Sequence, residues 1–369
     1  MKVLHVINDL RLAGAERLVA DLSRAQAANG LTVSVAPLSM SSSGFEDAVR
    51  SANVPLLLPE KPMPIRSPAH IPRLAKLFPG FDIVHVHLFP AQLWAVCAAT
   101  TLGKSAPVLV TTEHNTHNGR RGNPLLRPVD AAMYARYARI AAISDATRDA
   151  LTAYLPATAA KISVVTNGID TARFAQTGSA AERATLFPNV SATASLLLSI
   201  GRLEVQKDFP TLLRAVALVP NAHLAIIGDG VLRGDLEALA AFLGIRERVR
   251  FLGKRGDIPA LLRNADLYVQ PSLWEGFGIA AVEAMASGLP VVASDVPGLR
   301  EVVGDAGVLV KKGSADGFAS AMNRLLADAD ARTVLSQKAR ARAESFTIEA
   351  CQRAYQTFYL NTQHLTPNT

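Results

Sequence analysis

The sequence predicts an α/β protein of two doubly wound domains, each built on a parallel sheet with helices on both faces. Short apolar, β-branched runs alternate with helix-length connections along the whole chain. The runs are almost continuously apolar, which is typical of parallel strands buried on both faces. The length of 369 residues exceeds one ordinary core and suits two domains of about 150–200 residues. We therefore expect two such sheets in series.

Eleven segments are expected strands. The first series comprises Val3–Ile7, Val33–Pro37, Ile83–His87, Val108–Thr112, Arg139–Ile143 and Ile162–Val165. The second series comprises Leu196–Ile200, Leu224–Ile227, Val249–Leu252, Leu267–Gln270 and Val291–Ala293. Small and polar residues after Asn167–Asp170 predict a boundary, with domains at 1–180 and 181–346. From Thr347 onward, apolar residues at helical spacing predict a final helix.

The cysteine content and the lengths of the apolar runs indicate where in the cell the protein is expected. The two cysteines, Cys97 and Cys351, cannot make a disulfide framework or a four-ligand zinc site, so we expect a reducing, cytoplasmic location. No apolar run approaches the roughly 18 residues that span a bilayer. The first apolar run is too brief for a signal-peptide core and reads as a strand.

The net charge of +7 lies mostly in the first half, where residues 1–180 hold 18 Lys+Arg against 12 Asp+Glu. Aromatics make up only 6% of the chain and no dense basic run contains them, which disfavours nucleic acid as a partner. An anionic membrane face, an anionic acceptor, or a basic surface that keeps the protein soluble remain open.

One basic stretch precedes an expected helix with an apolar stripe. Its cations are Arg120, Arg121 and Arg127, and the stripe contains Leu126, Val129, Met133, Tyr137 and Ile140. Such a stripe is more typical of a core than of a membrane face. The arginines are nevertheless candidates for anionic headgroups or for a diphosphate-linked acceptor.

Polar and glycine residues collect where the expected strands end. Ligands of open parallel sheets bind outside the carboxyl ends of the strands, so these positions predict the binding edges. They include Asn8, Asp9 and Gly14, then His87, Glu113, His114, Asn115, Ser144 and Asp145, and in the second half Gly201, Arg202, Lys207, Glu275 and Glu283. We expect the two edges to face each other across a cleft.

The segment from Pro271 to Ser294 predicts an anion site flanked by carboxylates. Glu275 lies in the loop after a strand, and Glu283 lies about one turn into the helix expected over 278–287. The N–H groups at the helix start are a ready anion site; they belong to Phe277, Gly278 and Ile279. Carboxylates accept paired hydrogen bonds from vicinal hydroxyls. The combination of phosphate and hydroxyl binding indicates a sugar nucleotide.

Arg202 and Lys207 follow Gly201 at another strand end. A cation at ~4 Å from a phosphate charge is worth roughly 4 kcal/mol before desolvation, at an effective dielectric constant near 20. A helix terminus supplies only about 0.3–1 kcal/mol, at most ~2. We therefore expect these two side chains to contribute most to stabilising a departing diphosphate.

No metal and no cofactor is expected. His85 and His87 alternate on a strand and are expected to face opposite sides, one toward the cleft and one toward the core. Asp328 and Asp330 form a D-x-D pattern, but in a polar helical stretch rather than at a strand end. The glycines at 228–230 lack the G-x-G-x-x-G spacing of a dinucleotide loop.

The motifs GRLEVQKD (Gly201–Asp208), EGFGIAAVE (Glu275–Glu283) and SGLPVVASDVPGLREVV (Ser287–Val303) resemble those of retaining GT-B glycosyltransferases. The closest group is family four, which includes phosphatidylinositol mannosyltransferases and sucrose synthases. VTNGID (Val165–Asp170) and the loop around Gly14 match more loosely. The resemblance runs over nearly the whole chain, with one departure, Pro297, where the family often has the first glycine of a pair.

The resemblance implies two Rossmann-like domains, an acceptor-side one at 1–180 and a donor-binding one at 181–346, with a helix at 347–369 crossing back onto the first. It implies that Arg202 and Lys207 hold the donor diphosphate, Glu283 the ribose, and Glu275 the transferred sugar. The amides of Phe277, Gly278 and Ile279 would lie against sugar and phosphate. Gly14 would let its loop close over the diphosphate, and His114 would bond the donor sugar near the reacting centre.

The resemblance implies transfer of a sugar from a nucleoside diphosphate sugar to an acceptor hydroxyl with retention of configuration, with uridine the first choice of base and guanosine the second. The acceptor would be a glycan, a lipid-linked sugar or a small molecule in bacterial polysaccharide or glycolipid assembly, reached from the cytoplasm or the inner membrane face. Two rivals stay open: a GT-B nucleotide-sugar epimerase or phosphorylase, and a non-catalytic sugar-nucleotide binding subunit.

Overall fold

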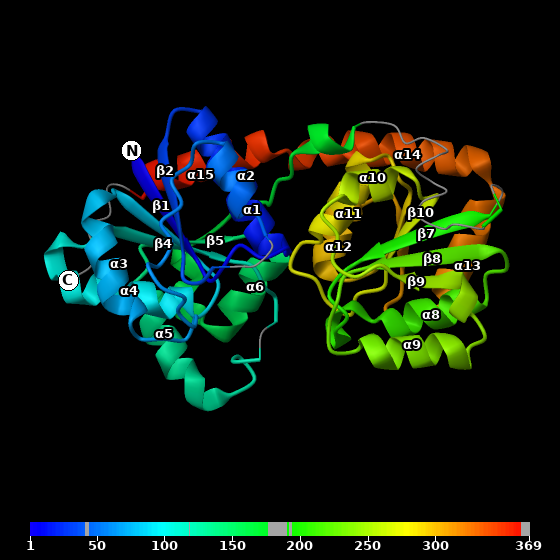
Figure 1. The fold of residues 1–369 in the computed structure, drawn as a ribbon, viewed down its shortest axis with the longest axis horizontal. Coiled ribbons are helices and arrows are strands. Elements are labelled where there is room, and N and C mark those ends of the chain that lie inside the picture. Colours follow the sequence, from blue (N-terminus) through cyan, green and yellow to red (C-terminus); the bar gives the residue numbers. More distant parts are fainter. Residues whose placement is uncertain (41–43, 118, 176–189, 192–193, 363–369) are drawn as a thin grey trace. The chain divides into compact units, whose positions relative to one another are not determined.

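The computed structural model describes residues 1–40, 44–117, 119–175, 190–191 and 194–362 (Figure 1). The chain forms two compact units. Unit 1 comprises Met1–Gly168 together with Ile348–Thr369, and unit 2 comprises Ile169–Thr347. The predicted boundary between residues 180 and 181 lies outside the described residues. The chain thus passes from one unit to the other twice, after Gly168 and after Thr347.

Unit 1 contains a six-stranded parallel sheet with the order β2-β1-β3-β4-β5-β6. Its strands are β1 (Lys2–Ile7), β2 (Thr32–Pro37), β3 (Ile83–His87), β4 (Val108–Glu113), β5 (Arg139–Ala142) and β6 (Ile162–Val164). Its helices are α1 (Gly14–Ala28), α2 (Glu46–Ser51), α3 (His70–Leu77), α4 (Ala91–Leu102), α5 (Arg127–Ala135), α6 (Asp145–Tyr154) and α15 (Ile348–Leu360). The helices cover both faces of the sheet, with α1 and α15 on one and α3, α4 and α5 on the other (Figure 1).

Unit 2 contains a second six-stranded parallel sheet with the order β12-β11-β10-β7-β8-β9. Its strands are β7 (Ser195–Ile200), β8 (Ala222–Ile227), β9 (Val249–Phe251), β10 (Leu267–Gln270), β11 (Val291–Ser294) and β12 (Val308–Val310). Its helices are α8 (Phe209–Ala217), α9 (Arg233–Phe242), α10 (Ile258–Arg263), α11 (Ile279–Ala286), α12 (Pro297–Val303), α13 (Ala315–Ala327) and α14 (Ala329–Ala343).

The predicted doubly wound α/β architecture is confirmed, and all eleven predicted strands are present with ends shifted by two residues at most. The sequence prediction missed β12, which has only three residues and lies at the edge of its sheet. Three consecutive apolar residues are common in a chain that is 49% hydrophobic, so they do not by themselves indicate a strand. It forms a strand because β11 supplies a parallel partner, with Val292 opposite Val308.

The chain returns to unit 1 through α15, whose buried face is apolar. Cys351, Tyr355 and Phe358 pack against Val3 of β1 and Leu18 of α1, all of them buried. The contact closes one face of the first sheet with residues more than 300 positions away in sequence. No helix among the described residues combines the length and the apolar character needed to cross a membrane.

Replacing Phe358 by alanine is expected to lower the unfolding free energy of unit 1 by about 3–5 kcal/mol, because it removes a buried aromatic ring from this contact. Thermal unfolding of the full chain measures the loss. The matched control is Thr357→Ala on the exposed side of the same helix, which is expected to stay within about 0.5 kcal/mol of the wild type. Equal midpoints for the two variants would show that α15 does not complete this core.

Candidate active site

The carboxyl end of β7 in unit 2 positions Lys207. The strand ends at Ile200, and a 3-10 turn over Val205–Lys207 brings the lysine side chain back across Gly201. A Cβ on Gly201 would lie 2.9 Å from both Cδ and Cε of Lys207. Because Gly201 has no side chain, the aliphatic part of Lys207 can pack directly against its backbone. Gly228 similarly lets the end of β8 pack on Gly201, whose carbonyl oxygen would lie 2.0 Å from a Cβ there.

The carboxylate of Glu275 is buried and receives several donors. Its Oε1 accepts hydrogen bonds from Lys207 Nζ at 2.5 Å, Gln270 Nε2 at 2.7 Å and Ser272 Oγ at 2.7 Å. Gln270 is in turn held by the Tyr268 hydroxyl, which donates to its Oε1 at 2.9 Å. A buried carboxylate is stable only with such partners, so the end of β10 builds a fixed socket for Glu275.

The ion pair between Lys207 and Glu275 joins the loops after β7 and β10. Gln206 Nε2 donates to the Trp274 carbonyl at 3.0 Å, and the Leu273 amide donates to the Gln206 carbonyl at 2.8 Å. The lysine and glutamate side chains are only 16% and 8% exposed. The cation and the carboxylate therefore have defined positions before any ligand arrives.

Helix α11 begins beside this socket. Its N-cap Gly278 has φ of +106°, and a Cβ there would lie 2.6 Å from Leu299 Cδ2, so a glycine is required. In the described part of the chain, the backbone N–H groups of Phe277, Gly278 and Ile279 have no hydrogen-bond partner. The Phe277 ring is buried and meets Phe346 edge-on at 5.5 Å, which anchors the loop. Free amides at a helix start are the kind of donor group that suits an anion.

The second glutamate, Glu283, lies within α11 and is also buried. Burial, followed by the charges of Glu275 and then Glu283, raises the pKa of Tyr268 well above its usual value. Both carboxylates therefore lie near enough to the Tyr268 hydroxyl of β10 to act on it.

Arg202 lies beside this group but is exposed. Its side chain is 59% accessible and pairs with Glu204 at 2.8 Å, two residues along the chain. An exposed pair of this kind is worth at most about 1 kcal/mol, so an incoming phosphate can replace the glutamate at little cost. Unit 2 thus contains the predicted donor-side residues from Gly201 to Glu283.

Gly298 explains why the departure at Pro297 is tolerated. A Cβ on Gly298 would lie 2.7 Å from the Glu275 carbonyl oxygen, so glycine is required for α12 to approach the Glu275 loop. Pro297 occupies the first position of α12, where a missing N–H is harmless. The glycine at 298 therefore lets α12 support the loop that carries Glu275.

Two predicted residues belong to unit 1. Gly14 is exposed and is the first residue of α1, at the end of the loop that follows β1. His114 follows β4 and is buried, and burial lowers the pKa of its imidazole to about 3. Its Nε2 lies 3.1 Å from Nδ1 of His87.

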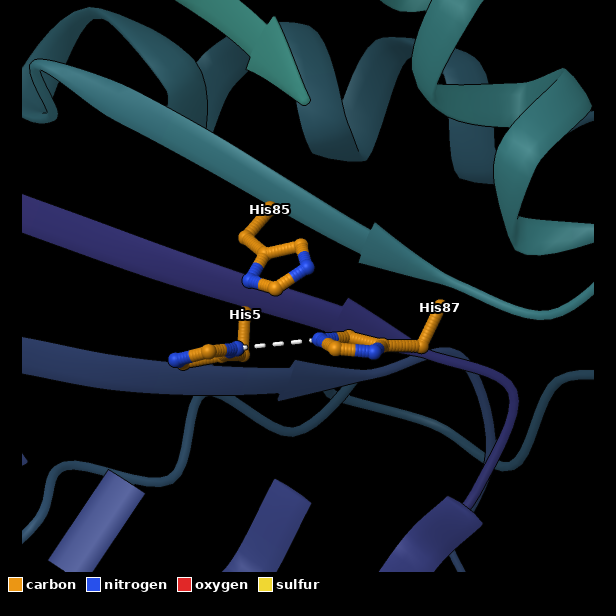
Figure 2. A group of neighbouring side chains, drawn as sticks. All are labelled: His5, His85 and His87. Atoms are coloured by element: carbon orange, nitrogen blue, oxygen red, sulfur yellow. Dashed lines mark hydrogen bonds between the residues drawn. The ribbon is translucent and has the colours of Figure 1, made fainter. Parts of the chain in front are cut away.

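The expectation that His85 and His87 face opposite sides of the sheet is wrong. Side chains two residues apart on a strand point to the same face. Both lie on one face of β3 and meet His5 of β1, as Figure 2 shows, and all three are fully buried. Nitrogen atoms of these three side chains lie within 4.8 Å of one another. Neither His85 nor His87 is exposed at the edge of the sheet.

Two of the predicted headgroup-binding arginines have internal partners. Arg120 pairs with buried Asp130 at 3.1 Å, and Arg121 pairs with buried Glu113 at 3.0 Å. The predicted apolar stripe divides in the same region, because Met133 is buried while Val129 is 51% exposed. These arginines hold their own loop against unit 1, which accounts for part of the basic charge.

Sequence reasoning did not predict the supporting residues. Gln270 was expected only as the last residue of a strand and Tyr268 as an ordinary strand residue, and Ser272 was given no role. A polar residue ending an otherwise apolar strand, with serine three positions before a glutamate, is the signal that would have found Gln270 and Ser272. Tyr268 gives no such signal, because its role depends on the path of the loop after β10.

Comparisons with known proteins show the family and the fold. The family model described as Glycosyltransferase Family 4 matches residues 12–173, and the model described as Glycosyl transferases group 1 matches residues 186–342. HepE from Anabaena, solved in complex with UDP and glucose, superposes with a TM-score of 0.85 at 22% identity, over 97% of this chain and 99% of that one. The fold is therefore that of the GT-B glycosyltransferases.

Two curated relatives are informative. The lipopolysaccharide core biosynthesis glycosyltransferase LpsE of Rhizobium meliloti is 35% identical over 53% of this chain and 56% of its own length. The UDP-Gal:α-D-GlcNAc-diphosphoundecaprenol α-1,3-galactosyltransferase of Escherichia coli is 28% identical over 77% of this chain and 76% of its own length. The match thus spans little more than half of the first relative and three quarters of the second. The chain belongs to glycosyltransferase family 4.

Replacing Gly201 by alanine is expected to weaken UDP binding at least about tenfold and to lower the stability of unit 2, because the displaced Lys207 leaves the buried Glu275 carboxylate without its cation. The new methyl group meets only the flexible Lys207 stem, so the lysine moves and a charged hydrogen bond worth about 1.5–3 kcal/mol is lost. Calorimetric titration with UDP and a thermal unfolding curve separate the two effects. The control is Gly234→Ala in α9, where a Cβ meets nothing. Unchanged UDP affinity in Gly201→Ala would contradict this role.

The stability of unit 1 is expected to fall as the pH drops from 7 to 5. Burial lowers the pKa of His114 to about 3 and that of His5 to about 4, so the unfolded chain, with histidine pKa values near 6.5, binds more protons than the folded one. The stabilisation is complete above about pH 6.5 and is lost toward the folded pKa values, up to about 2 kcal/mol for each imidazole at pH 5. Urea unfolding at several pH values measures the slope; a flat profile would contradict it.

Proposed function

We propose that the protein is a retaining glycosyltransferase that moves a sugar from a UDP-sugar to a hydroxyl of a lipid-linked or polysaccharide acceptor. The observation that carries the proposal is the arrangement around Glu275, where a paired lysine, a second buried glutamate and the amides of α11 meet at the end of one sheet. Amides and cations suit phosphates, and carboxylates suit sugar hydroxyls.

The donor and the acceptor in this proposal are suggested by the names of similar proteins. HepE was solved with UDP and glucose, and the Escherichia coli relative is named for UDP-Gal and a diphosphoundecaprenol acceptor. LpsE is named for lipopolysaccharide core synthesis. These names favour uridine as the base and an acceptor that belongs to an envelope glycan or its lipid carrier. An acceptor of that kind would place the protein at the inner face of a membrane.

The proposed mechanism is front-face transfer. A double displacement needs a carboxylate free to attack the anomeric carbon. Glu275 is a poor candidate, because three donors already occupy its Oε1 and Lys207 offsets its charge. In the front-face route the bond from the anomeric carbon to the departing phosphate oxygen breaks, and the acceptor oxygen forms the new bond on the same side. The acceptor proton passes to the departing phosphate while Arg202 and Lys207 stabilise the charge that develops there.

The rival functions differ in their products. An epimerase would convert its nucleotide sugar with no acceptor present, and a phosphorylase would require inorganic phosphate. A non-catalytic subunit would bind the nucleotide and transfer nothing. Product analysis with and without acceptor, using the nucleotide sugar that most raises the melting temperature in a panel, separates the three.

Arg202→Ala and Lys207→Ala are each expected to lower kcat/KM by roughly ten- to a hundredfold or more, equivalent to about 1.5–3 kcal/mol of transition-state binding. The loss should fall on kcat as well as KM, because the phosphate gains charge as the bond breaks. Arg214→Ala on the exposed face of α8 removes the same charge elsewhere in unit 2 and serves as the control. Rates close to wild type in both site variants would end this proposal.

Dialysis against EDTA is expected to leave the transfer rate unchanged. Arg202, Lys207 and the α11 amides are proposed to supply the counter-charge that a divalent cation provides in other transferases. The assay compares chelated protein with protein given excess Mg²⁺ or Mn²⁺. A rate that collapses on chelation and returns with metal would contradict metal-independent transfer.

A further inference from the structure

A continuous chain of buried hydrogen bonds leads from His114 into the interior of unit 1. His114 Nε2 lies 3.1 Å from His87 Nδ1, and His87 Nε2 lies 3.0 Å from His5 Nδ1. His5 Nε2 in turn lies 2.8 Å from Gln26 Oε1, on helix α1. His5, His87 and Gln26 are all fully buried. Figure 2 shows the His5 and His87 rings meeting edge to edge, nitrogen to nitrogen.

Each imidazole in this chain is neutral near pH 7. Burial lowers the pKa values of His114 to about 3 and of His5 to about 4, and that of His87 falls well below its usual value for the same reason. A neutral imidazole has one N–H and one acceptor nitrogen. Fixing the proton on one ring of such a chain therefore fixes it on every ring.

Gln26 determines the direction of the chain. Its carbonyl Oε1 can only accept, so His5 carries its proton on Nε2 and offers Nδ1 as an acceptor. His87 must then donate from Nε2 and accept at Nδ1, and His114 must donate from Nε2. By this sequence of donors and acceptors, the remaining nitrogen of His114, Nδ1, carries a lone pair.

A second branch of hydrogen bonds begins at the amide nitrogen of Gln26. This nitrogen, Nε2, donates to the Tyr359 hydroxyl at 3.2 Å, and that hydroxyl lies 2.6 Å from His85 Nδ1. His85 Nε2 lies 2.6 Å from Thr112 Oγ1, which lies 2.9 Å from the Tyr355 hydroxyl. Turning the amide over would require the proton order of this whole branch to reverse as well. The proton orders of the two branches are therefore linked through Gln26.

We propose that Gln26 is a positioning residue that, through His5 and His87, holds His114 as the Nε2–H tautomer and leaves its Nδ1 as a hydrogen-bond acceptor. Among the described residues, none forms a hydrogen bond with His114 Nδ1; the bond to His87 uses the other ring nitrogen, Nε2. A ring nitrogen that accepts selects a ligand group that donates, which for a sugar is a hydroxyl. The meaning of this selection rests on the proposed function, whereas the tautomer itself does not.

The same side chains do not form a ready metal site. Both nitrogens of His85 already have partners, Tyr359 and Thr112. His5 Nδ1 and His87 Nε2 lie 3.0 Å apart and directly toward each other, which is a hydrogen-bond distance. The His85 and His87 rings lie side by side, with centroids 4.1 Å apart. The three lone pairs therefore do not converge on one point as tetrahedral ligation requires.

Histidine-selective ¹⁵N labelling of the full chain tests the proposal without any substrate. The chemical shifts of the two ring nitrogens distinguish a protonated nitrogen from one with a lone pair, and the spectrum of His114→Asn assigns the signals. At pH 7 we expect His114 to show a protonated Nε2 and an unprotonated Nδ1. A proton on Nδ1 of His114 in the wild type would overturn the proposal.

Variants add a second measurement. Gln26→Met removes the acceptor and the donor together, and is expected to raise the Nδ1-protonated share of His114 by roughly two- to tenfold, the range that one lost hydrogen bond produces. The matched control is Gln92→Met, another buried glutamine of unit 1, which bonds Thr111 at 2.9 Å outside this chain. An identical His114 spectrum in wild type and a folded Gln26→Met would overturn the proposal.

Two further results distinguish the tautomer proposal from a metal site and from the proposed function. One equivalent of Zn²⁺ added after chelation is expected to leave the signals of His5, His85 and His87 in place; stoichiometric shifts of all three would establish a metal site and overturn the tautomer chain. Transfer activity with the wrong His114 tautomer would refute this inference alone. The expected tautomer in a protein without transfer activity would support the chain while refuting the proposed function.

Discussion

The donor-side geometry depends on the burial of one carboxylate, that of Glu275. A buried carboxylate costs several kcal/mol unless donors surround it, so the chain must bring Lys207, Gln270 and Ser272 to the same oxygen. Meeting that requirement fixes the loops after β7 and β10 relative to each other. The lysine that neutralises the carboxylate is also the cation next to the helix start. Stability and ligand geometry therefore arise from the same contact in unit 2.

Unit 1 also buries polar side chains, but these are neutral. Six buried polar side chains, His5, Gln26, His85, His87, Thr112 and Tyr359, satisfy one another across β1, β3, β4, α1 and α15. Neutral groups avoid the desolvation cost of ions, but each must meet a partner of the opposite kind. The result is a directional network, in which the order of donors and acceptors is as specific as the shape of the core around it.

The sequence predicted most of the fold because its information is local. Continuous apolar runs identify parallel strands, and their polar ends identify Gly201, Arg202, Lys207, Glu275 and Glu283 directly. The buried polar network of unit 1 was not predictable in the same way. His5, Gln26 and Tyr359 lie far apart in sequence and meet only through sheet order and the return of α15, and the error over His85 and His87 came from misjudging the period of a strand. The strand β12 needed its neighbour β11 to be recognised.

The discontinuity of unit 1 has a consequence during synthesis. The segment Ile169–Thr347 of unit 2 leaves the ribosome before α15 does, a delay on the order of ten to forty seconds at ordinary elongation rates. Throughout that time the apolar cluster around Val3 of β1 and Leu18 of α1 lacks the residues that α15 contributes, and His85 lacks its tyrosine partner. Unit 1 is thus synthesised first but completes its folding last. Until α15 packs, chaperones can bind the apolar residues that this helix will cover.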